Sequence, residues 1–425
     1  EARICEAEPI LPRETLKPVS VRRCTLAHYE ARGDVVKDSK PFCSKEKEGW
    51  LYDFGVNTAG IETLRIKGER GQQIDLQFAE YINPDGELDY GNLGFYPDGF
   101  VQRDVYILKG EGEEVFEPQF TYHGARYCLV LGLTDEQATE ELLTFGICAS
   151  AIGDRGDFRC SDDTVNKLQA MTRNSDLSNF YYFPTDCPHR EKNGWTGDAA
   201  VSCEQLSLNF APEKSYKEWL RNIRKTQKET GELPGIIPTG GWGYEWGNGP
   251  AWDQVATVLP YMTYLLRGDR EILEENSPMI MRYAEYISRN RTARGTVELG
   301  LGDWCPVTKF KSPLEFTDSV VCMDILDKAA YIFSVLGQPL QEKFCVKLRR
   351  EIRSAVREHL IDLSTCTAIG CCQTSQAMAI YYNVFDPGEK AQAFKVLLKI
   401  ISDSDDHMDC GILGARCLFR VLADH

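Results

Sequence analysis

Residues 184–198 read Pro-Thr-Asp-Cys-Pro-His-Arg-Glu-Lys-Asn-Gly-Trp-Thr-Gly-Asp, and this stretch lies where the pattern of the chain changes from strand-like to helical. Pro188 disfavours helix at the residue before it, and Gly194 and Gly197 permit tight turns. The stretch therefore predicts a shaped loop that opens the helix following Asp198. Loops held by a rigid scaffold are where catalytic groups collect.

Strand signals precede this loop. Ile74, Leu76 and Phe78 alternate with polar residues, and further short apolar runs are separated by glycine breaks. This pattern predicts an antiparallel β-sandwich over residues 48–155. Residues 1–47 carry several prolines and weaker signals, so an extended linker leading into the sandwich is expected there.

Helical spacing follows the loop. Apolar residues recur every three or four positions in several segments, which predicts about eight to ten helices between residue 156 and residue 425, arranged as hairpins. The fold class is therefore multidomain, β followed by α. Three long loops interrupt the helices, at 184–198, 231–250 and 299–317. The clearest helical stripes are Val255, Leu259, Met262 and Leu266; Leu326, Ala330, Phe333 and Leu336; and Ile412, Ala415, Leu418 and Leu422.

Composition narrows the classes of function. The 425 residues are 43% hydrophobic and carry a net charge of −16, which opposes binding to nucleic acid or anionic lipid, and no apolar run is long enough to cross a bilayer. Sixteen cysteines are scattered through a large chain, which favours free thiols in a reducing, cytoplasmic compartment, with export left open. Neither a structural metal site nor a cofactor is expected.

The loop supplies the groups that glycoside hydrolysis requires. One carboxyl group gives a proton to the leaving oxygen, and a second carboxylate activates water or attacks the sugar. Glu191 is a plausible acid because nearby negative charge favours its protonated form. Asp186 and Asp198 are placed to accept hydrogen bonds from sugar hydroxyls, Arg190 to orient a carboxylate, and Trp195 to cover the C–H face of a pyranose.

Each of these residues has a structural alternative. Asp198 is also a suitable N-cap for the next helix, and Glu191 is suited to a surface ion pair with Arg190 or Lys192. Trp195 taken alone is more often a core residue. His189 has no partner visible in the sequence, so local packing or hydrogen bonding is its expected role.

Two further regions have the same composition. Residues 240–253 and 302–304 hold four of the seven tryptophans of the chain, with aspartate or glutamate beside them. Sugar sites are built from aromatic platforms flanked by carboxylates, so this clustering favours a carbohydrate-binding surface over four separate core residues.

Residues 184–198 closely resemble the signature loop of the bacterial α-L-rhamnosidases, which invert configuration and carry an (α/α)6 barrel. The resemblance extends from about residue 50 to the last residue. It includes segments similar to the β-domain before that barrel and segments similar to the barrel itself. These segments are Asp53–Gly55 and Pro118–Tyr127 upstream, and Ala251–Asp253, Gly302–Trp304 and Gly411–Arg416 downstream.

The resemblance implies a role for each residue of the site. Glu191 is then the general acid, and Asp186, Arg190, Trp195 and Asp198 surround the rhamnose. Further walls come from Trp252 and Trp304, with Asp303 a weaker candidate. One departure is that many members carry an extra acidic residue between the positions of Arg190 and Glu191. The implied substrate is a small glycoside or a polysaccharide with terminal L-rhamnose, and a homodimer is left open.

The resemblance also implies that the general base is a glutamate beyond His425, and that the barrel of residues 156–425 lacks its last helices. Three functions are therefore compared. The first is an inverting α-L-rhamnosidase, the second a non-catalytic sugar-binding or inactive fragment, and the third an (α/α)6 glycoside hydrolase for another terminal sugar.

Overall fold

The computed structural model describes residues 4–25, 48–84, 86–93 and 102–425, and the chain forms two compact units. The sheet unit consists of Glu8–Ile152 and Asp157–Lys192. The helical unit consists of Gly153–Gly156, Asn193–His425 and the first residues of the chain. The chain thus passes from one unit to the other between Lys192 and Asn193, within the loop of residues 184–198.

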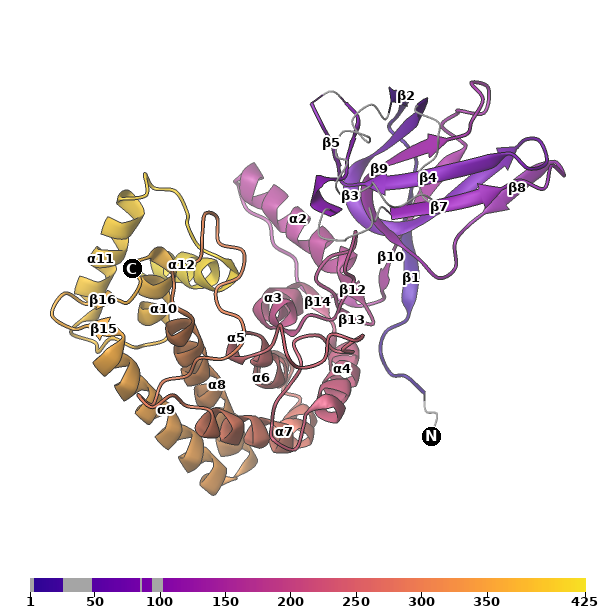
Figure 1. The fold of residues 1–425 in the computed structure, drawn as a ribbon. Helices are drawn as coiled ribbons and strands as arrows, with labels where there is room; N and C mark the ends of the chain where they lie inside the picture. Colours follow the sequence, from indigo (N-terminus) through magenta and orange to yellow (C-terminus); the bar gives the residue numbers. More distant parts are fainter. Residues whose placement is uncertain (1–3, 26–47, 85, 94–101) are drawn as a thin grey trace. The chain divides into compact units, whose positions relative to one another are not determined.

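The sheet unit is built on eight antiparallel strands. Their order is β1-β10-β3-β9-β4-β7, and β2 and β8 also pair with β3 (Figure 1). The strands are β1 (Ile10–Leu16), β2 (Ser20–Thr25), β3 (Glu48–Lys67), β4 (Gln73–Ala79), β7 (Gln102–Ile107), β8 (Glu113–Phe116), β9 (His123–Leu131) and β10 (Leu143–Ser150). The smaller elements are β5 (Tyr81–Ile82), β6 (Leu88–Asp89), the 3-10 helix η1 (Gly91–Leu93), α2 (Asp163–Ser178), β12 (Phe180–Tyr181) and β13 (Phe183–Pro184).

The long strand β3 organises this unit. Its first part pairs with β2 on one edge and β9 on the other, whereas its second part pairs with β10 and β8. The register with β9 shifts between Asp53 and Thr58, where Gly55 has a φ of 80°. Since one strand joins two sets of neighbours, the sheet curls around a common core, and the predicted antiparallel sandwich is confirmed. This core includes Tyr52, Phe54, Leu64, Ile74, Leu76, Phe78, Val130 and Phe145.

The linker predicted for residues 1–47 is wrong where the structure describes two of its stretches. Both are extended, but each is a strand of the sheet: Ile10 pairs with Ser150 through β1 and β10, and Ser20 pairs with Asp53 through β2 and β3. Prolines are tolerated in strands at edges and irregularities, and the β1 register indeed shifts just after Pro12. Residues 26–47 of the predicted linker lie outside the described residues.

Strand β4 differs from the predicted pattern in one respect. Ile74, Leu76 and Phe78 are fully buried as expected, but the polar residues between them, Asp75 and Gln77, are buried as well. Arg103 Nε donates to Asp75 at 2.8 Å, and the Tyr90 hydroxyl donates to Gln77 at 2.7 Å. The second face of the strand is therefore covered by side chains that satisfy its polar groups.

The helical unit confirms the helices that periodicity predicted. The stripes of Val255, Leu326 and Ile412 lie on α6, α8 and α12. The helices are α3 (Thr196–Asn209), α4 (Glu213–Thr226), α5 (Pro250–Asp253), α6 (Val255–Arg267), α7 (Arg270–Arg289), α8 (Leu314–Leu336), α9 (Pro339–His359), α10 (Gln373–Tyr381), α11 (Lys390–Ser402) and α12 (Ile412–Asp424). The unit also contains two short two-stranded sheets. One pairs β11 (Gly153–Asp154) with β14 (Phe210–Ala211), and the other pairs β15 (Ile361–Asp362) with β16 (Thr367–Ala368).

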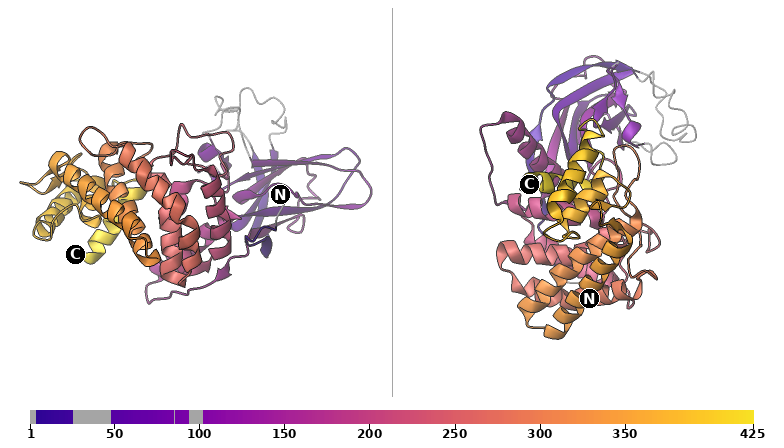
Figure 2. Two further views of the ribbon diagram at one scale, coloured as in Figure 1. Left: turned by 90° about the horizontal axis from the view of Figure 1, so that it is seen from below. Right: turned by 90° about the vertical axis from the view of Figure 1, so that its left-hand side faces the viewer.

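Five helices of this unit contact one another in a closed circuit. Helix α3 packs on α6, α6 on α8, α8 on α10, α10 on α12, and α12 on α3 again (Figures 1 and 2). Glu204 of α3 joins the last pair through ion pairs of 3.0 Å with Arg416 and 2.9 Å with Arg420. Helices α4, α7, α9 and α11 pack against members of this circuit.

Membrane-spanning helices and disulfides were both unexpected from the composition. No helix in the described ranges is both long and apolar enough to cross a membrane. The cysteines that the structure describes are all free thiols, as the scattered pattern predicted.

Candidate active site

The first part of the predicted catalytic loop belongs to the sheet unit and follows β13. A carboxylate oxygen of Asp186, one of Glu191 and the Cys187 sulfur all lie within 4.8 Å of one another. The thiol donates to Asp186 Oδ2 at 2.7 Å. Burial, followed by the charge of Asp186, raises the pKa of Cys187 to about 12, so the thiol keeps its proton as a donor. The structure thus brings together two of the carboxyl groups that the sequence identified.

Arg190 lies beside this pair. Its Nη1 donates to the Asn92 carbonyl at 2.5 Å, and its Nε lies 3.9 Å from Glu191 Oε1. The ion pair predicted as a structural alternative for Glu191 is therefore present with Arg190. Both side chains remain partly accessible, at 22% and 23% exposed, so a solute can still reach the Glu191 carboxyl group.

Residues outside the predicted set position this loop. Lys192 adopts a φ of 55°, its Nζ donates to the Tyr122 carbonyl at 2.5 Å, and the same nitrogen lies 4.4 Å from the centre of the Tyr122 ring. Burial lowers the pKa of Lys192 to about 8. Gly124 makes room for the loop, because a Cβ there would lie 2.6 Å from Pro188 Cγ and 2.8 Å from the His189 nitrogen. The segment Pro118–Tyr127, which the resemblance marked without a role, supplies two of these contacts.

His189 has the packing role expected for it. The side chain is buried, and burial lowers the pKa of its imidazole. Its Nδ1 lies 3.5 Å from Glu80 Oε2. A neutral, enclosed imidazole is suited to filling the space beneath the loop rather than to exchanging protons with a substrate.

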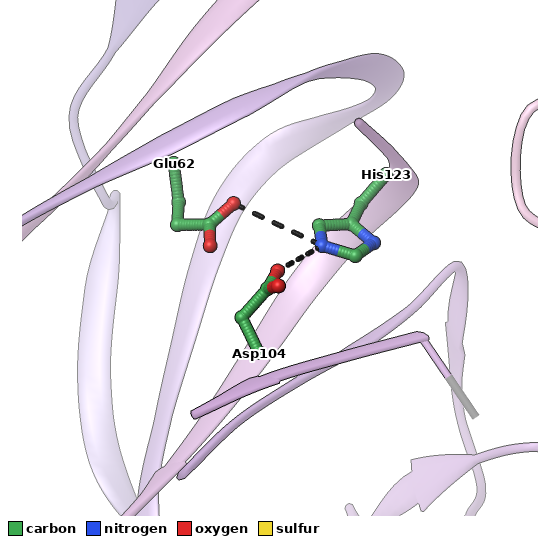
Figure 3. A group of neighbouring side chains, drawn as sticks. All are labelled: Glu62, Asp104 and His123. Carbon is green, nitrogen blue, oxygen red and sulfur yellow. Dashed lines mark hydrogen bonds and ion pairs between the residues drawn. The ribbon is translucent and has the colours of Figure 1, made fainter. Parts of the chain in front are cut away.

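Three titratable side chains form a buried cluster in the sheet unit: Glu62 of β3, Asp104 of β7 and His123 of β9 (Figure 3). His123 Nε2 bonds to Asp104 Oδ2 and lies 3.9 Å from Glu62 Oε2. Sequence spacing does not indicate this cluster, because its members lie on three separate strands and meet only through the strand order of the sheet.

A proton on Glu62 accounts for the charges of this cluster. Burial, reinforced by Asp104, raises the pKa of Glu62 to about 9, so Glu62 is protonated at neutral pH. Burial opposes ionisation of Asp104, but the hydrogen bond with His123 prevails and lowers its pKa. Burial also lowers the pKa of His123. Carboxylate and imidazole are donor types that bind divalent ions, but here one protonated acid, one carboxylate and one neutral imidazole already share the site.

The second part of the catalytic loop belongs to the helical unit. Trp195 is the N-cap residue of α3 and its side chain is buried, whereas Asp198 lies in the first turn of the helix. The alternative of Asp198 as N-cap is therefore wrong. A carboxylate in the first turn is nevertheless stabilised there, because it faces the positive end of the helix dipole.

The three tryptophan-containing loops of this unit lie side by side. Thr196 N donates to the Gly235 carbonyl at 2.9 Å, and Leu301 N donates to the Asn248 carbonyl at 3.0 Å. Gly247, with a φ of 79°, packs directly on Trp195, because a Cβ there would lie 2.5 Å from the indole ring. Residues from 193–198, 231–250 and 299–304 are thus held together by backbone contacts that larger side chains would prevent.

Their indole rings form a continuous array. The ring centres of Trp252 and Trp304 are 6.4 Å apart, those of Trp304 and Trp246 are 6.2 Å apart, and those of Trp246 and Trp195 are 5.4 Å apart. Trp252 is 2% exposed, and within the described residues its Nε1 has no hydrogen-bond acceptor. The predicted clustering of tryptophans is therefore seen in this unit.

Asp303, the weaker candidate for the sugar site, makes four hydrogen bonds within the helical unit. Its Oδ1 accepts from the backbone nitrogens of Leu413 and Gly414 at 3.0 Å each, and its Oδ2 accepts from Gly411 N at 2.7 Å and from Thr374 Oγ1 at 2.6 Å. These four donors engage both oxygens, so Asp303 caps the start of α12 and supports the neighbouring Trp304. We therefore leave it out of the sugar site.

Comparison with known proteins shows that most of this chain is similar to one family. The model of the bacterial α-L-rhamnosidase six-hairpin glycosidase domain matches residues 153–425, and that of the bacterial α-L-rhamnosidase concanavalin-like domain matches residues 44–148. An α-L-rhamnosidase of Formosa agariphila is 32% identical over 306 residues, which cover 68% of this chain and 31% of the relative. One of Streptomyces avermitilis is 28% identical over 380 residues, covering 88% of this chain and 35% of the relative.

Solved structures show the same relationship. The structure of Streptomyces avermitilis α-L-rhamnosidase complexed with L-rhamnose has a TM-score of 0.85 and 25% identity, over 99% of this chain and 38% of that one. The structure of α-L-rhamnosidase from Dictyoglumus thermophilum has a TM-score of 0.84 and 29% identity, over 98% of this chain and 45% of that one. The chain spans about a third of the length of the curated relatives described above. Because the family's glycosidase-domain model alone matches more than half of its residues, this chain belongs to the bacterial α-L-rhamnosidase family.

Proposed function

We propose that the protein containing this chain is an inverting α-L-rhamnosidase that removes terminal, non-reducing α-L-rhamnose from glycosides or polysaccharides. The observation that carries this proposal is the partly accessible carboxyl group of Glu191, beside Asp186, in the loop that resembles the family signature. The printed description of the Streptomyces avermitilis structure, a complex with L-rhamnose, supports rhamnose as the sugar.

In this proposal Glu191 is the general acid. Its carboxyl group gives a proton to the glycosidic oxygen as the bond from the anomeric carbon to that oxygen breaks. A second carboxylate removes a proton from a water molecule that attacks the opposite face of the sugar, so the product has inverted configuration. We do not assign that second carboxylate within this chain.

We propose sugar-binding residues in each unit separately. In the sheet unit, Asp186 and Arg190 are polar groups that can pair with rhamnose hydroxyls. In the helical unit, Asp198 is a further polar group of this kind, and Trp195, Trp252 and Trp304 offer flat apolar walls.

Replacement of Glu191 by glutamine in the full-length protein tests the proposal. Aryl α-L-rhamnosides with poor leaving groups need protonation, so we expect kcat/KM to fall by about 10²–10⁴-fold. An activated dinitrophenyl rhamnoside should lose much less, because its leaving group departs without a proton. Glu69→Gln, at an exposed position in the sheet unit, is the control and should retain full activity.

Two outcomes would count against the proposal. Turnover of the poor leaving group within about twofold of wild type would remove Glu191 from the role of acid. Hydrolysis of a different aryl glycoside, with no activity on the rhamnoside, would reassign the terminal sugar.

A further inference from the structure

We infer that Trp242 and Trp246 form a platform that binds the flat, apolar aglycone of the substrate. This inference rests on the proposed rhamnosidase function and adds to it a second binding site, for the group attached to rhamnose. Neither tryptophan has a part in the rhamnose site proposed above.

The two indoles are exposed as a pair. Trp242 is 48% exposed and Trp246 is 44% exposed, whereas Trp195, Trp219 and Trp252 are buried. The Trp242 and Trp246 ring centres lie 5.5 Å apart with an angle of 29° between their planes. Two stacked aromatic rings left open to water form a contiguous apolar surface, which is typical of a binding site.

The platform is continuous with the proposed rhamnose walls. Trp195 lies 6.2 Å from Trp242 and 5.4 Å from Trp246, measured between ring centres, and the Trp246 contact is edge-to-face. Trp246 also meets Trp304 edge-to-face at 6.2 Å. A substrate whose rhamnose lies against Trp195 and Trp304 therefore has these two exposed indoles beside it.

The loop that carries the platform is held in place before any ligand binds. Trp242 N donates to the Thr239 carbonyl at 2.9 Å, and Asn248 Nδ2 donates to the Tyr244 carbonyl at 2.9 Å. Tyr244 in turn donates through its hydroxyl to the Thr226 carbonyl, and Lys228 Nζ lies 4.0 Å from the centre of its ring. A preformed platform avoids much of the ordering cost of binding.

The composition of the loop favours an aromatic occupant over a second sugar. Apart from the tryptophans, residues 240–247 consist of four glycines, Tyr244 and Glu245. The Tyr244 hydroxyl is engaged, which leaves Glu245 as the acidic side chain of this segment. A sugar needs several hydrogen-bond partners around its hydroxyls, whereas a planar aryl group needs only the apolar face that the indoles provide.

The test uses full-length enzyme carrying Trp242→Ala, Trp246→Ala or both. A flavonol rhamnoside supplies a flat aglycone and methyl α-L-rhamnoside a small one, and kcat/KM is measured for each. We expect about a tenfold loss on the flavonol substrate for each single variant. Activity on the methyl rhamnoside and inhibition by free L-rhamnose should stay within about twofold. Phe419→Ala, another exposed aromatic of the helical unit, is the matched control.

Equal losses on both substrates, or no loss on either, would overturn the inference. A loss confined to a rhamnose-containing disaccharide would show that the platform binds a sugar instead. If the wild type hydrolyses none of these substrates, the proposed function fails. The platform is then tested separately by titrating the free flavonol against tryptophan fluorescence, where unchanged affinity in the double variant would refute it.

Discussion

Glu62 is a carboxyl group that the fold keeps out of water. Its pKa in the folded protein is about 9, against an ordinary value of 4.5. The folded protein therefore holds a proton that the unfolded chain has released, so the contribution of Glu62 to stability is greatest below about pH 4.5 and is lost as the pH rises towards 9. Glu62→Gln imitates the protonated acid and cannot titrate.

We therefore predict that the free energy of unfolding falls less in Glu62→Gln than in wild type between about pH 5 and about pH 8.5. Urea denaturation at several pH values measures both slopes, with Glu69→Gln as a control that should follow wild type. Parallel slopes in wild type and Glu62→Gln would mean that the cluster does not hold its proton on Glu62.

Asp303 supports a second prediction at the scale of single residues. In Asp303→Asn an amide NH₂ replaces one of the two accepting oxygens, so a donor faces other donors at the start of α12. We expect a loss of unfolding free energy on the order of 3 kcal/mol, because buried hydrogen bonds to a charge are broken. Denaturation midpoints measure this loss. Asp405→Asn, an exposed position nearby, should cost much less, and equal effects of the two substitutions would contradict a capping role.

At the scale of elements, the first turn of α3 packs on the wall of the proposed rhamnose site. A Cβ at Gly197 would lie 2.5 Å from the Trp252 ring, so Gly197→Ala must push the indole or the helix away. Overpacking of this kind costs about 1–3 kcal/mol. We expect at least about a tenfold weaker inhibition by L-rhamnose, together with a changed tryptophan emission spectrum. Gly388→Ala has open space around it and should behave as wild type; rhamnose affinity preserved in Gly197→Ala would separate Trp252 from the site.

The helices and strands of this chain differ in how far the sequence alone predicts them. Helix α6 was predictable because its apolar residues recur every three or four positions and so lie on one face of a helix. This periodicity can be identified without knowing which elements pack against the helix. Strands β1 and β2 were not predicted, because they depend on pairing with β10 and β3, which are distant in the sequence. The prolines of this segment also weaken its local strand signal. The buried state of Asp75 depends on Arg103 in a neighbouring strand, which sequence spacing cannot indicate.

The residues of the proposed site also differ in how far the sequence predicts their contacts. The short-range cluster of Asp186, Arg190 and Glu191 could be identified because its chemistry lies within a few consecutive residues. The capping contacts of Asp303 could not be predicted, because its partners lie 71 to 111 positions away. The support that Lys192 receives from Tyr122 was likewise invisible, since only the folded sheet unit brings them together.

At the scale of the whole molecule, the exposure of the cysteine thiols distinguishes the surface of both units from their cores. Cys5, Cys160, Cys305 and Cys371 are exposed, whereas the other described cysteines are buried. Burial raises the pKa of the latter group in many cases, Cys203 to about 12 among them, which suppresses the reactive thiolate. We predict that iodoacetamide labels the four exposed thiols first in the native protein, as followed by peptide mass spectrometry. Labelling of Cys203 at a comparable rate would contradict the described core, and labelling after denaturation provides the control.

The contacts of Asp303 also have a consequence for the order of events during synthesis. Asp303 leaves the ribosome 108 residues before Gly411, the first of the backbone donors that it binds near α12. Until that later segment emerges, the Asp303 carboxylate lacks the backbone donors of α12, and the tryptophan-rich loop beside it lacks these stabilising contacts. Translation speed over the intervening residues therefore sets how long this loop is exposed to chaperones and proteases.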